Sequence, residues 1–323
     1  MAKNGAIRVG VIGTGKHGSR YVNHILNDIE GLELSAISRR SEEGRLQGES
    51  WGATWFARWE DLVREDCVDA VISVVPPYLN SRIAEECAEN KKPLLLEKPL
   101  GTDADDAERI VEEMAKARTP LTVGQTLRYN PVVQALKRKL PSFGELFSIY
   151  ANQRLEPSAL GWHSVPEIAG AGITIHTAVH IFDALHYITG RKINRVMAGS
   201  YRYHNDRLED LVTILFEMDD NVVGTIDVSR VGSARSGRYE FVCKDGHLYG
   251  DQVHGVLESV RASGREEPVL SAPVGTIVPL LEEWKQFLLE KGKNPVPGED
   301  GLYAVRVCNS CLQSAREGTW IEI

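Results

Sequence analysis

Near its N-terminus the chain carries an apolar run followed by a glycine-rich loop: Ile7-Arg8-Val9-Gly10-Val11-Ile12-Gly13-Thr14-Gly15-Lys16-His17-Gly18. Residues 6–12 are mostly apolar and β-branched, which predicts a buried strand. The apolar residues after the loop recur at helical spacing: Val22, Ile25, Leu26 and Ile29. A Gly-x-Gly-x-x-Gly loop between a strand and a helix is the context in which this motif binds a dinucleotide.

Each glycine of the loop has a physical role. The first permits the tight turn, the second lets the backbone approach a pyrophosphate, and the third lets the helix pack closely on the strand. The N-terminus of the following helix offers free N–H groups and a positive dipole to the phosphates. We therefore predict that the whole loop binds the cofactor: Gly13, Thr14, Gly15, Lys16, His17 and Gly18.

The end of the second predicted strand, residues 32–38, bears on the choice between NAD and NADP. Enzymes that use NAD place a carboxylate there for the ribose 2′-hydroxyl. This chain has Ser38, Arg39 and Arg40 instead. Guanidinium groups suit a 2′-phosphate, which accepts paired, charge-assisted hydrogen bonds. The sequence favours NADP(H) over NAD(H), with all three residues in the cofactor site.

The pattern of predicted elements changes near residue 125. Before it, short apolar strands alternate with helices, which predicts a parallel sheet covered on both faces: 6–12, 32–38, 69–75, 93–97 and 119–124. After it, longer strands dominate, separated in places by turn signals: 145–155, 193–204, 211–218, 222–231 and 238–243. We predict an α/β fold with a dinucleotide-binding domain over 1–125 and an α+β substrate domain over 126–323.

Composition limits the partners. The 323 residues include 37 Lys+Arg and 45 Asp+Glu, a formal net charge of −8. Nucleic acids and anionic membranes both attract basic surfaces, so neither is expected as the main partner. Five cysteines are too few for a disulfide framework and are typical of a reducing cytoplasm. We recognise no targeting segment and no run close to the roughly 20 apolar residues of a membrane helix.

Glu97-Lys98-Pro99 follows the predicted strand over residues 93–97. A dinucleotide fold followed by this tripeptide resembles the glucose–fructose oxidoreductase/inositol dehydrogenase (Gfo/Idh/MocA) family. Further segments resemble the family in the same order: residues 74–80 (its loop beside the nicotinamide), 128–131 (the start of its second domain), 170–172 with His180 and Asp183, and 314–318 (its usual ending). The resemblance implies a Rossmann domain, a second domain with a large, mostly antiparallel open sheet, and a homodimer or homotetramer.

For activity, the resemblance implies hydride transfer between NAD(P) and a carbinol or carbonyl carbon of a sugar, inositol or related polyol. It makes Lys98 and His180 the residues that handle the hydroxyl proton. It also adds residues to the cofactor site: Pro76, Pro77, Asn80, Glu97 and Lys98 itself.

His176, His180 and Asp183 lie at i, i+4 and i+7, which on an α-helix is one face. By resemblance, Asp183 binds a substrate hydroxyl. Many relatives have an aspartate where this chain has His176. Here His176 either shares the proton relay or binds a hydroxyl or acid group of the substrate, and a hydrogen-bonded structural histidine is the third interpretation. Two histidines and an aspartate also have metal-ligand spacing, but Thr177 replaces the glutamate of a zinc-protease helix, and we expect no metal.

Other residues are weaker candidates for the substrate site: Tyr129, Arg154, Trp162 and His163. Arg230, Arg235 and Arg238 are compatible with a loop for an anionic substrate or with a subunit contact, although a solvated loop is the default. Two other functions remain open. One is a non-catalytic NADP-binding regulator, and the other is an enzyme that oxidises its substrate transiently with a tightly bound cofactor.

Overall fold

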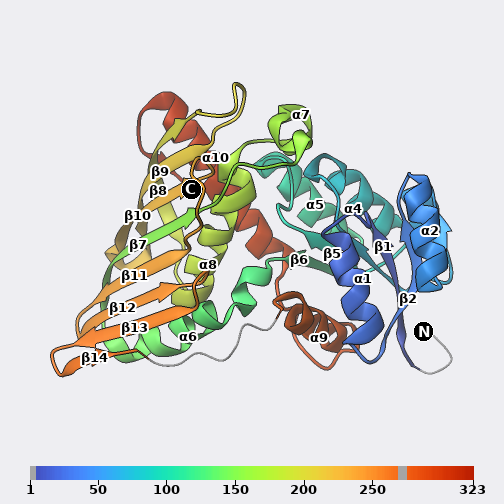
Figure 1. Cartoon of the computed structure of the whole chain (residues 1–323), viewed down its shortest axis with the longest axis horizontal. Coiled ribbons are helices and arrows are strands. Elements are labelled where there is room, and N and C mark those ends of the chain that lie inside the picture. The colour runs from blue at the N-terminus through green and yellow to red at the C-terminus, as the bar shows by residue number, and fades with distance from the viewer. Residues whose placement is uncertain (1–4, 268–274) are drawn as a thin grey trace. The chain divides into compact units, whose positions relative to one another are not determined.

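The computed structural model describes residues 5–267 and 275–323, which form two compact units (Figure 1). The first unit contains the residues up to Gln125 together with Ile277–Leu302, and the second contains Thr126–Thr276 and Tyr303–Ile323. The predicted division at residue 125 did not assign 277–302 to the first unit. These residues belong there because Lys285 Nζ donates to Glu30 O at 2.9 Å and Asn294 Nδ2 donates to Leu121 O at 2.7 Å.

The first unit is built on a six-stranded, all-parallel sheet with the order β3-β2-β1-β4-β5-β6. Its strands are β1 (Ile7–Ile12), β2 (Leu32–Ser38), β3 (Thr54–Phe56), β4 (Ala70–Ser73), β5 (Leu94–Glu97) and β6 (Leu121–Gly124). Val9 and Val11 of the central strand are fully buried, as the apolar run predicts. This doubly wound sheet confirms the predicted α/β class.

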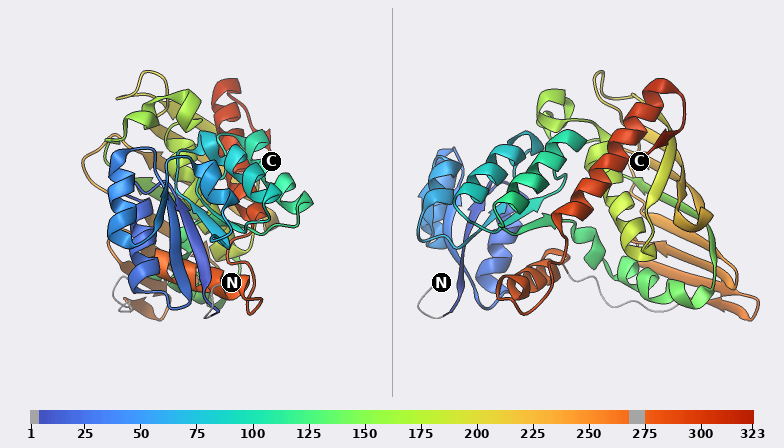
Figure 2. Two further views of the ribbon diagram at one scale, coloured as in Figure 1. Left: turned by 90° about the vertical axis from the view of Figure 1, so that its right-hand side faces the viewer. Right: turned by 180° about the vertical axis from the view of Figure 1, so that it is seen from behind.

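Helices connect and cover these strands (Figure 2). They are α1 (Gly18–Asn27), α2 (Glu42–Trp51), α3 (Trp59–Arg64), α4 (Asn80–Glu89), α5 (Ala104–Lys116) and α9 (Ile277–Leu288), with a 3₁₀ turn η1 (Pro77–Leu79). Local sequence sets their ends. The carboxylate of Asp103 accepts the N–H of Asp106 and caps α5, and Gly52 ends α2 in the left-handed conformation.

The second unit contains a nine-stranded sheet with the order β14-β13-β12-β11-β7-β10-β9-β8-β15. Its strands are β7 (Leu146–Arg154), β8 (Ile193–Tyr201), β9 (Leu211–Met218), β10 (Val223–Ser229), β11 (Arg238–Cys243), β12 (Gly246–Asp251), β13 (Val256–Arg261), β14 (Gly264–Glu266) and β15 (Ile321–Glu322). β7 and β10 pair in parallel and the other neighbours pair antiparallel. This large mixed sheet confirms the predicted second domain type.

Helices α6 and α8 contact one another, and the same two helices contact strands β12 and β7, respectively (Figure 1). The helices and turns are η2 (Thr126–Tyr129), α6 (Pro131–Lys139), η3 (Leu140–Phe143), η4 (Gly161–Ser164), α7 (Pro166–Ala169), η5 (Thr174–Ala178), α8 (Val179–Thr189), η6 (Asp219–Asn221) and α10 (Gly298–Glu317). Asn130 caps α6 by accepting the N–H of Val132, and Pro131 occupies its first turn. η5 is a π-helical turn that leads directly into α8.

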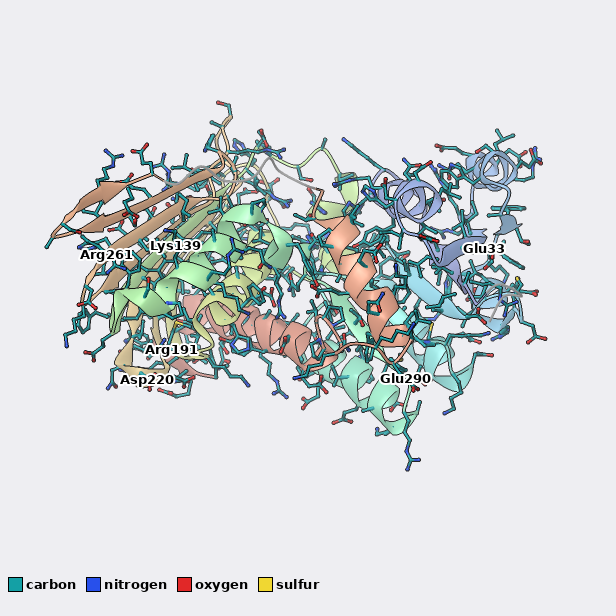
Figure 3. The ribbon with its side chains drawn as sticks, turned by 90° about the horizontal axis from the view of Figure 1, so that it is seen from below. Glu33, Lys139, Arg191, Asp220, Arg261 and Glu290 are labelled. Carbon is teal, nitrogen blue, oxygen red and sulfur yellow. The ribbon has the colours of Figure 1, made fainter. Side chains whose placement is uncertain are left out.

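A surface ion pair joins two connections at one end of this sheet. Arg191, just before β8, donates to Asp220 in η6 at 3.0 Å, and the two side chains lie next to each other in Figure 3. The pair joins the start of β8 to the turn between β9 and β10.

The segment Pro166–Thr189 is long and apolar enough to cross a membrane by length and composition, which the sequence analysis did not recognise. In the structure 83% of its most apolar window is buried. A buried core helix of a globular unit can have the same length and apolar composition, so this segment is only weak evidence of a membrane span.

Candidate active site

The glycine loop between β1 and α1 has the backbone shape of a phosphate cradle. Gly13 has φ +87°, and a Cβ atom there would lie 2.3 Å from Val74 O. A Cβ on Gly18 would lie 2.0 Å from Gly13 O, whereas a Cβ on Gly15 would meet nothing within 4 Å. Gly13 and Gly18 therefore permit close packing of the loop on its neighbouring backbone, and Gly15 leaves the outer side of the loop open. This arrangement is suited to binding a dinucleotide.

The side chains of the loop differ in their surroundings. Thr14 is fully buried and its hydroxyl donates to Gln47 Oε1 at 2.8 Å, so it holds α2 against the loop. Lys16 is exposed. His17 is also exposed, and its Nε2 lies 2.9 Å from Glu97 Oε1. Of the three, Thr14 acts through its packing, while Lys16 and His17 are accessible to a ligand.

A cavity of about 530 Å³ lies at the ends of β1, β2 and β4. The predicted cofactor residues on its walls are Gly13, Ser38, Arg39, Arg40 and Pro76. Sequence reasoning did not single out three further residues on these walls, Arg58, Trp59 and Arg82. Arg58 and Trp59 follow the three-residue strand β3, which was not predicted, and Arg82 of α4 lies over the Trp59 ring. Four arginines on one wall favour a ligand with phosphate groups.

These arginines are not equally available. Arg39 donates from Nη1 to Thr14 O and Gln47 Oε1, both at 3.2 Å, and it also pairs with Glu43. Arg58 and Arg82 share Glu60, with N···O distances of 3.7 and 3.5 Å. Arg40 is exposed, and no ion pair or hydrogen bond involves its side chain within the described residues. Arg39 thus braces the glycine loop, and Arg40 is the cation most open to a phosphate.

Glu97, at the end of β5, is a buried carboxylate with three donors around it. Tyr21 Oη donates to Oε1 at 2.6 Å, His17 Nε2 lies 2.9 Å from the same oxygen, and the Lys98 N–H donates to Oε2 at 3.0 Å. Burial raises the pKa of Glu97, but the hydrogen bonds from His17 and Tyr21 and the charges of His17 and Lys98 lower it overall. Glu97 stays ionised and supports the half-buried Lys98 that follows it.

Asn80 also supports the Lys98 segment. It is 2% exposed, and its Nδ2 donates to Pro99 O at 3.0 Å and Leu100 O at 3.1 Å. Pro77 is likewise buried, whereas Pro76 lies on the wall of the cavity. Pro76 can touch a cofactor directly, while Asn80 and Pro77 are placed to hold the loops that do.

In the second unit, half-buried His180 lies on the wall of a cavity of about 390 Å³. Polar side chains share this wall: Thr126, Asn130, Gln153, Arg235 and Gln252. The amide oxygens of Gln153 and Gln252 are buried and accept no hydrogen bond within the described residues. Of these residues, sequence reasoning singled out Arg235, and Asn130 falls in the segment 128–131 that resembles the start of the family's second domain. Thr126, Gln153 and Gln252 come from η2, β7 and the end of β12, and no motif marks them.

His176 and Asp183 do not share the cavity of His180. His176 is 4% exposed and its Nε2 donates to Ala169 O at 3.0 Å, and it faces a separate recess. Asp183 is 1% exposed and accepts from Arg128 Nε and Nη2 at 2.9 and 2.6 Å. His176 lies in the π-turn η5, so α-helical spacing does not apply between it and His180, and the two histidines line different cavities. The paired carboxylate of Asp183 is better placed to stabilise the unit than to bind substrate.

The remaining candidates fall in two places. Trp162 and His163 pack on His176, with ring centroids 5.4 and 4.7 Å from its ring. Tyr129 lies in η2, beside Leu127 and Asn130 of the His180 cavity. Arg154, at the end of β7, donates to Asp227 at 2.6 Å. Trp162 and His163 thus lie with His176, whereas Arg154 is paired with Asp227 on the sheet.

Within residues 5–267 and 275–323, no group of three or more His, Cys, Asp or Glu side chains has metal-binding geometry. The pair Cys308 and Cys311 is fully buried in α10, and Cys308 Sγ donates to Thr174 O at 3.3 Å. Burial raises the pKa of both thiols. These cysteines pack in the core of the second unit.

Comparison with known proteins places this geometry among oxidoreductases. Residues 7–125 match the oxidoreductase family with an NAD-binding Rossmann fold named Gfo/Idh/MocA, and residues 142–249 match the C-terminal domain of Gfo/Idh/MocA proteins. The chain is 30% identical to inositol 2-dehydrogenase 1 of Saccharopolyspora erythraea, over 98% of this chain and 96% of that protein. It is 27% identical to inositol 2-dehydrogenase of Rubrobacter xylanophilus, over 97% and 92% of the two chains.

Solved structures share the fold of the whole chain. An oxidoreductase domain protein from Kribbella flavida matches with a TM-score of 0.89 at 21% identity, over 98% of this chain and 99% of that one. Levoglucosan dehydrogenase in complex with NADH and levoglucosan matches with a TM-score of 0.89 at 17% identity, over the same shares of the two chains.

Proposed function

Because the chain belongs to the Gfo/Idh/MocA family of oxidoreductases, we propose that it is an NAD(P)-dependent dehydrogenase of a sugar, inositol or related polyol. It transfers a hydride between the nicotinamide and a carbinol or carbonyl carbon of that substrate. The names of the relatives support the substrate class, since several are inositol 2-dehydrogenases.

The observation that carries the proposal is the cavity beside His180. The buried amide oxygens of Gln153 and Gln252 on its wall accept no hydrogen bond within the described residues, and leaving such acceptors without donors costs free energy. A polyol supplies a hydroxyl donor for each, and Asn130 and Thr126 offer further polar contacts. The cavity therefore suits a ligand covered with hydroxyl groups next to an imidazole that can exchange a proton.

Two residues carry the proton chemistry. The ammonium of Lys98 donates to the reacting oxygen and stabilises negative charge that develops on it. His180 accepts the hydroxyl proton during oxidation and returns it during reduction. The bound nicotinamide supplies the hydride or accepts it. Glu97 and Asn80 position the segment that carries Lys98.

We assign NADP(H) as the preferred cofactor. The support is the arginine-lined cavity at the end of β2, where Ser38, Arg39 and Arg40 stand in place of the carboxylate of NAD enzymes and Arg40 is open to a phosphate. Among the described residues that line this cavity, Glu60 is the carboxylate, and Arg58 and Arg82 lie near enough to neutralise its charge.

We also place the protein in the cytoplasm as a homodimer or homotetramer. All five cysteines are free, as in a reducing compartment. Adjacent strands of the nine-stranded sheet expose large apolar side chains: Phe147, Met197, Leu215 and Val223. Light scattering on the purified chain measures the assembly, and a monomer at micromolar concentration would contradict it.

The deciding experiment incubates the purified protein with a panel of inositols, sugars and polyols and either NADP⁺ or NAD⁺. Stoichiometric formation of reduced nicotinamide, with the larger kcat/KM for NADP⁺, is the expected result. A non-catalytic regulator binds cofactor but gives no absorbance change. A transient-redox enzyme converts the substrate without net change in the cofactor, and either outcome would overturn the proposal.

A further inference from the structure

A second, smaller recess of about 80 Å³ lies in the second unit, lined by His163, His176 and Arg230. The end of β7 and the loop after it supply residues to both places: Gln153 and Leu155 line the cavity of His180, and Pro157 and Ser158 line the recess. A recess of this size has room for a few water-sized groups. The recess is suited to one end of a ligand, such as a small charged group.

Arg230 is the permanent cation of this recess. It follows β10 directly, and its backbone N–H donates to Asp210 O at 2.8 Å, which fixes where the side chain starts. Its guanidinium is half-buried, with Nη1 2.8 Å from His163 Nδ1 and Nη2 3.2 Å from Thr177 Oγ1. It forms no ion pair in the part of the chain that the structure describes, although the charge of Asp210 acts on it from a greater distance. A guanidinium has five N–H donors, so this partly desolvated cation keeps donors for an anion.

The partners of the two histidines determine where their protons lie. Arg230 can only donate, so His163 Nδ1 is an acceptor, and Ser158 Oγ, 2.8 Å away, also donates to it. His163 is therefore neutral, with its proton on Nε2. Ala169 O can only accept, so His176 carries a proton on Nε2. The two rings stack with centroids 4.7 Å apart.

Two carboxylates also face the recess, and both are held by backbone N–H groups. Glu209 accepts from Gly172 N and Thr174 N at 3.0 and 3.1 Å. Asp210 Oδ2 accepts from the N–H groups of three consecutive residues, Tyr203, His204 and Asn205, at 2.7 to 3.0 Å. His204 is the remaining titratable group on the wall. Because two fixed carboxylates stand beside one guanidinium, a dianion such as a phosphate ester is repelled more strongly than a ligand with a single negative charge, which Arg230 must hold by direct hydrogen bonds.

We propose that this recess binds a carboxylate of the substrate, with Arg230 as its anchor, so that the enzyme acts on a sugar acid or polyol acid. The inference rests on the proposed function. Arg230 Nη2 lies 3.2 Å from Thr177 Oγ1, three residues before His180. Leu155, on the wall of the larger cavity, donates its N–H at 2.9 Å to the carbonyl oxygen of Ser229, the residue before Arg230. A ligand whose acid group is held by Arg230 therefore needs to extend only a few bonds to place a carbon in the cavity of His180, where the proton chemistry occurs.

The first test uses the wild-type enzyme with pairs of compounds that differ only in the acid group: gluconate and glucitol, glucuronate and glucose, galacturonate and galactose. We expect kcat/KM to be at least about 10-fold higher for the acids, since a charge-assisted hydrogen bond contributes about 1.5–3 kcal/mol. Equal or better turnover of the neutral members would overturn the inference while leaving the proposed function intact. Preference for a sugar phosphate would overturn the assignment of a carboxylate. No turnover of any compound would instead refute the proposed function.

The second test is Arg230→Gln, with Arg230→Lys and Arg265→Gln beside it. Arg230→Gln should raise KM for the acids about 10–100-fold and change kcat/KM for neutral substrates less than about 3-fold. Arg230→Lys should recover part of the loss, because it keeps the charge without the planar fork. Arg265 is exposed on β14 and pairs with Glu258, so its variant should match the wild type. Equal losses for acidic and neutral substrates in Arg230→Gln would contradict the inference; if this variant does not fold, the paired substrates decide the question.

Discussion

The hydroxyl of Tyr21 donates a hydrogen bond of 2.6 Å to Glu97, and both side chains are buried in the first unit. The contact joins α1, which starts at the glycine loop, to the end of β5, which carries Lys98. One carboxylate thus connects the loop expected to bind the pyrophosphate with the residue expected to handle the proton.

Tyr21→Phe should destabilise the protein by about 1.5–3 kcal/mol near neutral pH, because it leaves a buried carboxylate without one of its donors. The pKa of Glu97 is lowered in the folded protein, so its contribution is present above the unfolded value of about 4.3 and is lost as pH falls through the folded value. The difference between Tyr21→Phe and wild type should therefore shrink below about pH 4.

Urea unfolding at neutral and acidic pH measures this difference. Tyr203→Phe is the matched control, because Tyr203 is 64% exposed and its substitution should change the free energy of unfolding little. A penalty for Tyr21→Phe that stays constant down to pH 3 would show that the hydrogen bond to ionised Glu97 is not its source.

The buried pair of Arg128 and Asp183 gives a second prediction. Asp183→Asn should cost about 3–5 kcal/mol in unfolding free energy, because it leaves the guanidinium buried without its counter-charge. Glu217→Gln is the control, since the Arg195–Glu217 pair is more than one-third exposed on both sides and should contribute less than about 1 kcal/mol. An unchanged melting temperature together with a large loss of substrate affinity would instead assign Asp183 to the substrate.

These two contacts show how far the sequence leads. The glycine loop, β2, β9 and β11 follow from hydrophobic periodicity and turn residues, and the observed bounds of those three strands agree with prediction. Helix α2 was missed because its buried side is formed by Gly44 and Gly48. A Cβ on Gly44 would lie 2.6 Å from Arg39 Cβ, so close backbone packing replaces an apolar stripe.

The site was predictable only in part, for similar physical reasons. Motifs mark Lys98, His180 and the loop, but a π-turn leaves no recognised signal in the residues, so the sequence could not show that α-helical spacing ends between His176 and His180. Arg128 and Asp183 are 55 positions apart, and no local pattern joins them. Arg39 lines the cavity as expected of a cofactor residue, but no local pattern shows that its Nη1 also donates to Thr14 O and Gln47 Oε1.

Lys98→Met tests the proton chemistry. Loss of general acid–base catalysis should lower kcat by about 10²–10⁴-fold, while the dissociation constant of NADPH should change little, because the glycine loop and the arginine cavity remain. Lys91→Met is the control, since Lys91 lies at the opposite end of β5 and donates to Ala117 O at the surface. Single-turnover rates and fluorescence titration separate the two effects, and near-wild-type turnover in Lys98→Met would refute the role.

Arg40→Ala tests the choice of cofactor. Its guanidinium has no ion pair or hydrogen bond in the described residues and lines the cavity beside Ser38. If it binds the 2′-phosphate, its removal should weaken NADPH binding about 10–100-fold and NADH binding hardly at all, because only NADPH carries that group. Arg45→Ala is the matched control, since Arg45 pairs with Glu42 and Glu49 on the outer side of α2. Calorimetric titration of wild type and Arg40→Ala with both cofactors gives the four dissociation constants.

Equal weakening of NADPH and NADH binding in Arg40→Ala would place Arg40 on a part that the two cofactors share, such as the pyrophosphate. The preference for NADP would then have to come from Arg58 or Arg82.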